Sequence, residues 1–311
     1  MGDVHSSAAV LVSIMIPTYN QPEYIEQAVK SALAQDYPNL EVIVADDSNN
    51  ELTGSILQSY TADSRFRYYK NPKQLGRVGN YRKLLFELAK GEWVVMLDGD
   101  DYYIDSHYIS KAMQVATKEQ GVVLIGSGLK VLHSKTNSFD VHGLAATSFI
   151  VDGKEMFTKY RQLPNHQTDI YQRKLACELD FYRHPSAGSD SESIYRLCLH
   201  GKVAYLAGEV AVWRVHNENT TYTRDLSKQI KELSFIDKIY EYAIKFLNKQ
   251  DADAWRNVMY RGMTVHLFNL AYSLKSYRYS TWILLRFGKF LGLKTTLGFF
   301  RKLLFSRPSN A

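Results

Sequence analysis

The sequence predicts an α/β fold, in which a single, mostly parallel sheet is flanked by helices and followed by a C-terminal helical extension. Short apolar runs suited to buried strands alternate with amphipathic segments over the first part of the chain. Two of these runs end in clusters of aspartates, and beyond about residue 226 the pattern is helical throughout. Strand–helix alternation is typical of parallel sheets covered by helices on both faces.

Hydrophobic periodicity gives the order of the elements. We expect strands at residues 10–16, 40–45, 66–69, 93–97 and 122–125, with helices at 23–34, 52–60, 79–89 and 106–117. The middle of the chain is less regular, with helices expected at 153–163, 173–181 and after Ser189, and a strand pair joined by a turn at Gly208. Three helical regions follow, at 227–248, 252–274 and 281–305.

Length and composition are those of an ordinary globular protein of one or two domains. The 311 residues predict a domain over 1–226, with halves at about 10–127 and 128–226, and a helical region over 227–311. The two cysteines, Cys177 and Cys198, lack metal-site spacing and are interpreted as reduced thiols. The short polar start predicts no signal peptide, and no window is apolar enough for a membrane span. We therefore expect a cytoplasmic protein.

Positive charge is concentrated in the tail. Residues 275–307 hold eight Lys or Arg and no Asp or Glu, so the rest of the chain sums to 6 − 8 = −2. Aromatic and aliphatic residues alternate with these cations, which favours an amphipathic segment lying on the anionic inner face of the cell membrane. The same helices could instead cover the core or form an oligomer interface. No nucleic-acid-binding module is recognisable, so no nucleic-acid partner is expected.

The strand at 93–97 leads directly into three carboxylates, Asp98, Asp100 and Asp101. Carboxylates this close raise one another's pKa, and a divalent cation with a preference for oxygen ligands removes the conflict. The cluster is also good turn chemistry, so a solvated turn is the alternative. The sequence predicts that Asp98 and Asp100 hold Mg²⁺ or Mn²⁺.

A second acidic cluster, Asp46 and Asp47, ends an earlier strand, and Tyr19 follows the first strand. Because the carboxyl ends of parallel strands share one edge of the sheet, these side chains can meet the Asp98 cluster there. A ring that stacks on a base, a carboxylate that accepts from it and a metal for phosphates together predict a nucleotide site. The glycine-rich motifs of dinucleotide dehydrogenases and P-loop NTPases are missing from the sequence, which argues against both classes.

Four segments in order, at residues 12–20, 31–35, 41–48 and 90–101, resemble the family 2 inverting glycosyltransferases. The resemblance extends over about residues 10–222 and implies the GT-A fold, in which one nucleotide-binding α/β domain continues into an acceptor-binding part. It also implies a bacterial enzyme of glycan assembly.

The resemblance assigns roles residue by residue. Pro17 and Tyr19 would frame the nucleotide base, and Asp47, with Asp46 beside it, would read the base. Asp98 and Asp100 match the metal-binding Asp-x-Asp motif. The remaining residues expected to line the nucleotide cleft are Gly76, Arg77, Asn80 and Gly99.

Two later motifs complete the implied site. Asp190 matches the catalytic base of a Glu-Asp pair, although Ser189 stands where the family usually has Glu, and Glu192 is the nearest substitute base. The same residues could simply begin a helix, since Ser and Asp are common N-caps. His216, in the stretch at 213–220, matches a further metal or diphosphate ligand.

The implied reaction moves a sugar from a nucleotide-sugar, expected to be a UDP-sugar, to a hydroxyl of a glycan acceptor, expected to be lipid-linked, in the synthesis of surface polysaccharide or glycoconjugate. Asp190 would act as general base, so no covalent intermediate is needed. Two alternatives remain: a non-catalytic module that binds nucleotide-sugar or glycan, and a nucleotidyltransferase.

Overall fold

The computed structural model describes residues 9–216 and 225–305, and the chain divides into two compact units. Unit 1 comprises Met1–Gly153, Gln162–Pro185 and Ser189–His216, and unit 2 comprises Lys154–Arg161, Ser186–Gly188 and Asn217–Ala311. The units are defined by packing alone, so the functional division at residue 226 stays a prediction.

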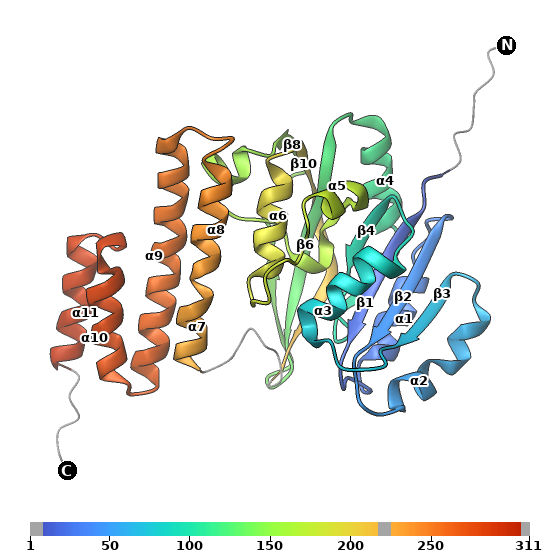
Figure 1. The fold of residues 1–311 in the computed structure, drawn as a ribbon, viewed down its shortest axis with the longest axis horizontal. Coiled ribbons are helices and arrows are strands. Elements are labelled where there is room, and N and C mark those ends of the chain that lie inside the picture. The colour runs from blue at the N-terminus through green and yellow to red at the C-terminus, as the bar shows by residue number, and fades with distance from the viewer. Residues whose placement is uncertain (1–8, 217–224, 306–311) are drawn as a thin grey trace. The chain divides into compact units, whose positions relative to one another are not determined.

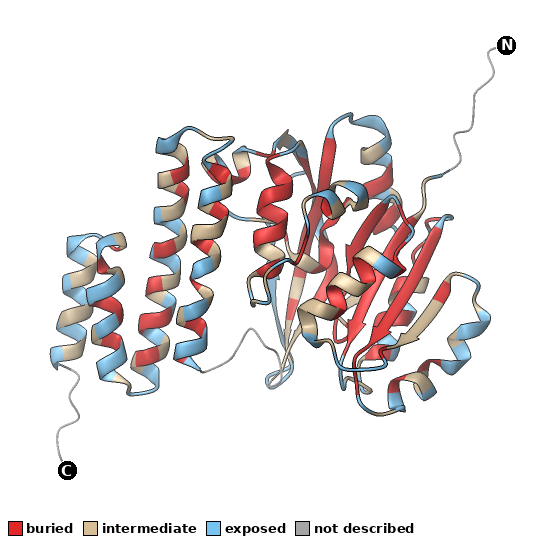
Figure 2. Ribbon diagram, viewed as in Figure 1, coloured by how far each residue is buried: buried red, intermediate tan, exposed pale blue. Residues whose placement is uncertain are grey.

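A curled mixed sheet forms the centre of unit 1 (Figure 1). Its first half is parallel, in the order β3-β2-β1-β4. These strands are β1 (Val12–Thr18), β2 (Leu40–Asp46), β3 (Phe66–Lys70) and β4 (Trp93–Met96). All residues of β1, β2 and β4 are buried, because helices cover both faces of this half (Figure 2). The predicted α/β class is confirmed.

The second half of the sheet adds antiparallel strands. β9 (Ile170–Gln172) pairs antiparallel with both β4 and the long β6 (Val122–His133), and β10 (Lys202–Val215) runs parallel to β6. Three short antiparallel strands, which periodicity did not predict, border them. They are β5 (Tyr102–Tyr103), β7 (Ser138–His142) and β8 (Phe149–Asp152).

The helices of unit 1 follow the expected order. They are α1 (Ile25–Leu33), α2 (Leu52–Leu57), α3 (Gly76–Arg82), α4 (Tyr108–Lys118), α5 (Arg173–Glu178) and α6 (Ser189–Cys198). α3 begins at Gly76, three residues before the predicted start, and continues as a π-helical turn, η2 (Lys83–Leu88). Both cysteines are free thiols.

The predicted strand pair around Gly208 is wrong, because β10 is one continuous strand. Its register against β6 shifts between Leu206 and Glu209 and again before Ala211, which marks a β-bulge. Gly208 has φ +108°, and the Ser127 hydroxyl donates to the carbonyls of Leu206 and Gly208 at 2.8 and 3.0 Å. These bonds satisfy the backbone that the bulge displaces, so the chain continues along β6 instead of turning back.

Unit 2 is helical. It contains α7 (Leu226–Glu232), α8 (Ser234–Ala243), α9 (Lys249–Ser273), α10 (Tyr277–Phe287), η6 (Gly288–Phe290) and α11 (Leu293–Phe305). The π-helical turn η3 (Met156–Tyr160) joins it by packing Phe157 against Trp255, with ring centroids 5.3 Å apart. Among the described residues, none of the helices has both the length and the apolar character that crossing a membrane requires.

Candidate active site

The carboxyl ends of β1, β2 and β4 meet at one edge of the sheet of unit 1. The Gly99 amide donates to the carbonyl of Pro17 at 3.1 Å, and the Asp47 amide donates to the carbonyl of Thr18 at 2.9 Å. Tyr19 follows β1 at this edge with 47% of its surface exposed, so its ring is accessible. The two acidic clusters therefore lie at the same edge of the sheet, on either side of the end of β1.

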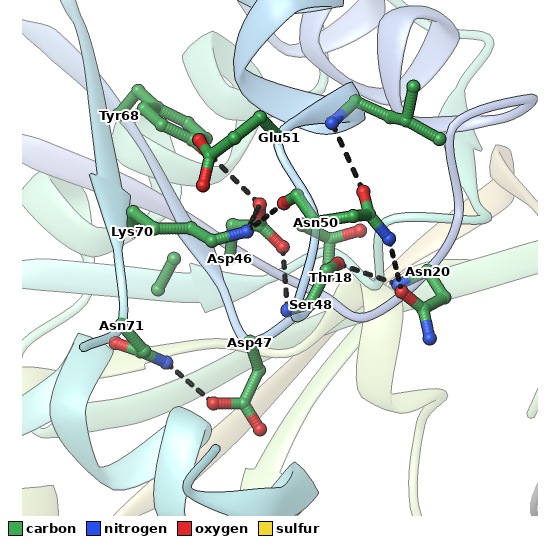
Figure 3. Close-up of polar contacts among 12 residues, drawn as sticks. Thr18, Asn20, Asp46, Asp47, Ser48, Asn50, Glu51, Tyr68, Lys70 and Asn71 are labelled. Atoms are coloured by element: carbon green, nitrogen blue, oxygen red, sulfur yellow. Dashed lines mark hydrogen bonds and ion pairs between the residues drawn. The ribbon is translucent and has the colours of Figure 1, made fainter. Parts of the chain in front are cut away.

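Asp46 is fully buried, and its carboxylate is occupied by neighbouring side chains (Figure 3). Oδ1 accepts from the Ser48 amide at 2.9 Å, and Oδ2 accepts from the Tyr68 hydroxyl at 2.9 Å and the Lys70 ammonium at 3.0 Å. Burial, together with the Asp46 carboxylate, raises the pKa of Tyr68, which keeps that hydroxyl a donor. Asp46 thus fixes the end of β2 and has no exposed oxygen for a ligand.

Asp47 anchors the loop that leads into α3. Its Oδ1 accepts from Asn71 Nδ2 at 2.9 Å and from the Leu75 amide at 2.8 Å, and Oδ2 accepts from the Gly76 amide at 2.8 Å. A carboxylate offers about four lone-pair positions, so Oδ2 keeps capacity for one further donor. Gly76 has φ +74°, a backbone conformation that favours glycine, at the point where the loop turns into the helix.

Asn80 is buried, and both ends of its side-chain amide bond within the protein. Its Nδ2 donates to the carbonyl of Ala45 at 2.8 Å, and its Oδ1 accepts from Asn71 Nδ2 at 2.9 Å. Asn80 therefore ties α3 to the end of β2 and acts as a supporting residue. Asn71, which sequence reasoning missed, links Asp47 to Asn80; its only signal was its place directly after a strand.

Arg77 and Tyr81 on α3 face the Asp98 carboxylate. The Tyr81 hydroxyl donates to Asp98 Oδ1 at 2.7 Å, and the Arg77 guanidinium lies over the Tyr81 ring, 5.4 Å from its centroid. Burial works against the Arg77 charge, but Tyr81, Asp190 and Asp98 outweigh it, so the pKa of Arg77 is raised. Arg77 is therefore within electrostatic reach of both Asp98 and Asp190.

Gly99 lies close against the end of β1, where a side chain would be crowded. A Cβ atom there would lie 2.8 Å from Gln21 Oε1 and 3.0 Å from the Pro17 carbonyl oxygen. The close approach lets the Gly99 amide bond to β1 and places the carboxylates on either side of it at the sheet edge.

Asp100 is nearly buried and is paired with His216. The His216 Nε2 atom lies 2.8 Å from Asp100 Oδ2, and the imidazole stacks on the Tyr24 ring at 5.2 Å. Burial and the nearby Asp98 raise the pKa of Asp100, and His216 partly offsets this. Burial, with Asp100 and Asp98, raises the pKa of Asp101 well above its ordinary value. Negative charge is therefore crowded at this edge.

Arg214, another residue that was not predicted as a site residue, ties β10 to the acidic loop. Its amide donates to Asp101 Oδ1 at 2.8 Å, and its Nε donates to the carbonyl of Asp100 at 2.9 Å. The guanidinium lies over the Tyr24 ring at 4.6 Å. These bonds bring His216 to Asp100, although residues 217–220 of the same motif lie outside the described residues.

The donor set at this edge suits a divalent cation that a substrate helps to bind. Within the described residues, no three His, Cys, Asp or Glu side chains are arranged as a complete metal site. Mg²⁺ and similar ions, however, are commonly held by one or two carboxylates together with substrate phosphates. Asp98 and Asp100 provide such a pair, and the electrostatic conflict between them is of the kind a cation relieves.

Asp190 and Glu192 differ sharply in what they can do. Asp190 is half-buried in the first turn of α6, and its Oδ1 accepts from the Ser191 amide at 2.7 Å. Glu192 is buried between two guanidinium groups, accepting from Arg183 at 2.6 Å and from Arg196 at 3.0 Å. Both carboxylate oxygens of Glu192 are engaged by these guanidinium groups, so the side chain is not available to an acceptor hydroxyl and is unsuited to serve as the substitute base.

A family model described as Glycosyl transferase family 2 matches residues 13–175, just over half of the chain's 311 residues. The chain belongs to glycosyl transferase family 2. The match includes the β1, β2 and β4 edge with Asp47, Asp98 and Asp100, and the resemblance seen in the sequence is confirmed.

The family 2 chain is similar to several known proteins over part of its length. It is 28% identical over 221 residues to an uncharacterised protein of Mycobacterium tuberculosis, covering 66% of this chain and 59% of that protein. It is 40% identical over 94 residues to the UDP-Glc:alpha-D-GlcNAc-diphosphoundecaprenol beta-1,3-glucosyltransferase WfaP of Escherichia coli, covering 30% of this chain and 37% of that protein. The chain therefore spans about three fifths or less of these relatives.

Solved structures share the fold. S. aureus TarS 1-349 in complex with UDP-GlcNAc superposes with a TM-score of 0.70 at 18% identity, covering 91% of this chain and 82% of that one. The mannosyltransferase PcManGT of Pyrobaculum calidifontis, in complex with GDP-Man and Mn²⁺, gives a TM-score of 0.56 at 14% identity, covering 97% of this chain and 89% of that one. The fold of this family 2 member is of the GT-A type, as expected.

Proposed function

We propose that this chain is a metal-dependent inverting glycosyltransferase that moves a sugar from a UDP-sugar to a hydroxyl of a lipid-linked glycan, at the inner face of the cell membrane. One observation supports this most: Asp98 and Asp100 lie at the carboxyl end of β4, where Asp98 accepts from the Tyr81 hydroxyl at 2.7 Å and Asp100 Oδ2 lies 2.8 Å from His216 Nε2. Arg77 lies over the Tyr81 ring, and Asp190 and Asp98 both contribute to its raised pKa, so we place the donor diphosphate beside this guanidinium.

The nucleotide base would stack on exposed Tyr19 beside Pro17. The remaining lone pair on Asp47 Oδ2 would accept the N3–H of uracil, a donor that cytosine does not have. Because Asp47 also holds the Leu75 and Gly76 amides, base recognition and the position of Arg77, the next residue of α3, would be coupled.

The diphosphate would lie between Arg77 and the Asp98–Asp100 pair. Asp98 and Asp100 would hold a Mn²⁺ or Mg²⁺ ion, which would supply positive charge against the leaving group. Arg77 adds a fixed cation that stays protonated, because its raised pKa is far from neutrality. His216 orients Asp100 through the 2.8 Å contact and can approach a phosphate oxygen.

Asp190 would take the proton from the acceptor hydroxyl. The hydroxyl oxygen bonds to the anomeric carbon as the bond from that carbon to the diphosphate oxygen breaks, and the nucleoside diphosphate leaves with that electron pair. Attack on the opposite face inverts the anomeric centre. General-base assistance of this kind contributes about 10²- to 10⁴-fold in rate.

The acceptor and the location are suggested by relatives. WfaP is named for a diphosphoundecaprenol-linked acceptor, and a Campylobacter jejuni relative, 37% identical over 109 residues, is named as a GalNAc(5)-diNAcBac-PP-undecaprenol beta-1,3-glucosyltransferase. Acceptors carried on such a lipid would require an enzyme that works at a membrane surface.

The decisive experiment is calorimetric titration of UDP with and without Mn²⁺ on the wild type and on Asp100→Ala. We expect Mn²⁺ to tighten UDP binding in the wild type and to have no effect in the variant. Asp140→Ala is the matched control, because Asp140 Oδ2 also lies 2.8 Å from a histidine, His133, but on the exposed strand β7. Candidate UDP-sugars would then be screened for release of UDP with an acceptor.

The outcomes separate the candidate functions. Binding of GDP or CDP in place of UDP would keep the architecture and change the donor. Pyrophosphate release from a nucleoside triphosphate would identify a nucleotidyltransferase, and tight nucleotide-sugar binding without turnover would identify a binding module. If no nucleoside diphosphate binds with either metal, the proposed function fails.

A further inference from the structure

The last two helices of unit 2, α10 and α11, carry only positive charges. No acid occurs anywhere in residues 275–307, and the exposed cations of the described part include Arg278, Arg286, Lys294 and Arg301. A surface with one sign of charge attracts a partner of the opposite sign. The chemistry of the side chains between these cations determines which anionic partner fits.

One side of α11 packs within unit 2. Phe299 stacks against Phe268 of α9 with centroids 4.2 Å apart, and the Thr296 hydroxyl donates to the carbonyl of Gly288 at 3.0 Å. Lys302 lies over the Tyr272 ring of α9 at 4.4 Å. These contacts fix which side of α11 faces the protein.

A second side of α11 presents an apolar stripe to solvent. Leu293, Leu297 and Leu304 are 77%, 57% and 69% exposed, and with Phe300 they occupy positions i, i+4, i+11 and i+7 of one helix face. We call these four residues the α11 stripe. No residue of α11 is buried, and three leucines this exposed along one helix face form an apolar patch of the kind that marks a binding surface.

Cations flank the α11 stripe. Lys294 and Arg301 each follow a stripe residue by one position, which in an α-helix rotates them about 100° around the axis, away from the Phe299 side. A helix that lies in the plane of a membrane interface typically has an apolar stripe with Lys and Arg beside it and no acidic residues.

α10 shows the same combination on its exposed side. Trp282 and Leu285 are exposed beside Arg278 and Arg286, whereas Ile283 and Leu284 are buried. The sequence predicts that the tail is amphipathic, and the structure shows which of its apolar residues are exposed. Only the exposed subset is available.

We infer that the α11 stripe, with Lys294 and Arg301 beside it and Trp282 and Leu285 of α10, docks onto the surface of an anionic lipid bilayer. A second copy of the chain fits less well, because a two-fold interface through this surface would set cations against cations. The inference rests on the proposed function for its biological sense, since a lipid-linked acceptor lies at such a surface, but it is tested without any substrate.

The test is co-sedimentation of the full chain with vesicles of phosphatidylcholine alone or with about one third phosphatidylglycerol. We expect binding only to the anionic vesicles, weakening as salt rises. Lys294→Glu with Arg301→Glu should lower the partition coefficient at least about ten-fold. Lys231→Glu with Lys245→Glu changes the net charge equally at exposed positions elsewhere in unit 2 and should have a much smaller effect.

The apolar contribution is tested by Leu293→Ser, Leu297→Ser and Leu304→Ser together, with circular dichroism to verify that the helices persist. Reduced vesicle binding supports the inference. Unchanged vesicle binding by the variants would overturn it, and so would an equal loss of binding in the Lys231→Glu, Lys245→Glu control. A wild-type dimer that the stripe substitutions dissociate would also overturn it. UDP binding measured on the same variants should be unchanged, so failure of the membrane surface and failure of the donor site can be distinguished.

Discussion

The His216 Nε2 atom lies 2.8 Å from Asp100 Oδ2, joining the end of β10 to the acidic loop after β4. Arg214 lies two residues before His216, and its backbone amide donates to Asp101 in the same acidic loop. Two side chains far apart in the sequence are thus held together by the sheet itself. A site pre-assembled in this way does not need to be ordered by its ligand.

The pairing predicts a graded effect of His216 on donor binding. His216→Gln should weaken Mn²⁺-stimulated UDP binding by about 10- to 100-fold, because Asp100 loses the partner that orients it. Asp100→Ala should abolish the stimulation. Titration calorimetry measures both, and His133→Gln, at the equivalent pair on β7, should leave UDP affinity unchanged.

Asp190 and Glu192 should separate catalysis from stability. Asp190→Asn should lower the turnover number by about 10²-fold or more while UDP affinity and the melting temperature stay near those of the wild type. Steady-state kinetics with a UDP-sugar and a matched thermal melt measure the two quantities. Normal turnover by this variant would remove Asp190 from the role of base.

Glu192→Gln should behave in the opposite way. It leaves the buried guanidinium of Arg196 without its counter-ion, which typically costs about 3 to 5 kcal/mol of unfolding free energy. Glu155→Gln, which removes an exposed ion pair with Lys159, should cost less than about 1 kcal/mol. Chemical denaturation compares them, and equal, small losses would contradict a structural role for Glu192.

Gly99→Ala should disturb the acidic loop. The added methyl group would meet the Pro17 carbonyl at 3.0 Å, so the loop must shift, at a typical cost of about 1 to 3 kcal/mol and with weaker UDP binding. Gly262→Ala is the matched control, because a Cβ atom there meets nothing within 4 Å inside α9 and should stabilise that helix slightly. Denaturation and UDP titration of both variants test the prediction.

Local patterns predicted the parallel half of the sheet well. β1, β2 and β4 are apolar runs buried on both faces, and their shared edge follows from their parallel pairing. Sequence reasoning therefore placed Asp47 and Asp98 at the same edge of the sheet, where the structure has them. It could not show that Asp46 is consumed by Tyr68 and Lys70, because both donors come from β3 and their approach depends on register.

The second half of the sheet was less predictable because its strands are short or exposed. β7 does alternate, with Phe139 and Val141 between polar residues, but it is only five residues long and all five are exposed, so the pattern was too short to stand out as a strand. Arg214 and Asn71 were not predicted as site residues for another reason. Each acts through a hydrogen bond to a partner distant in sequence, and a local sequence pattern does not show such a bond. The structural role of Glu192 likewise depends on its contacts with Arg183 and Arg196, which the sequence pattern does not show.

The bulge in β10 also limits how this chain can change length. Gly208 resembles a surface turn, where insertions and deletions are normally tolerated, yet the residues beyond it carry Arg214 and His216 in a fixed register with β6. Removing one residue there would advance the strand by about 3.3 Å and turn each following side chain to the opposite face. Library designs and homologue grafts should therefore preserve chain length between Leu206 and Ala211, because a single deletion would detach the imidazole from the acidic loop without altering any site residue.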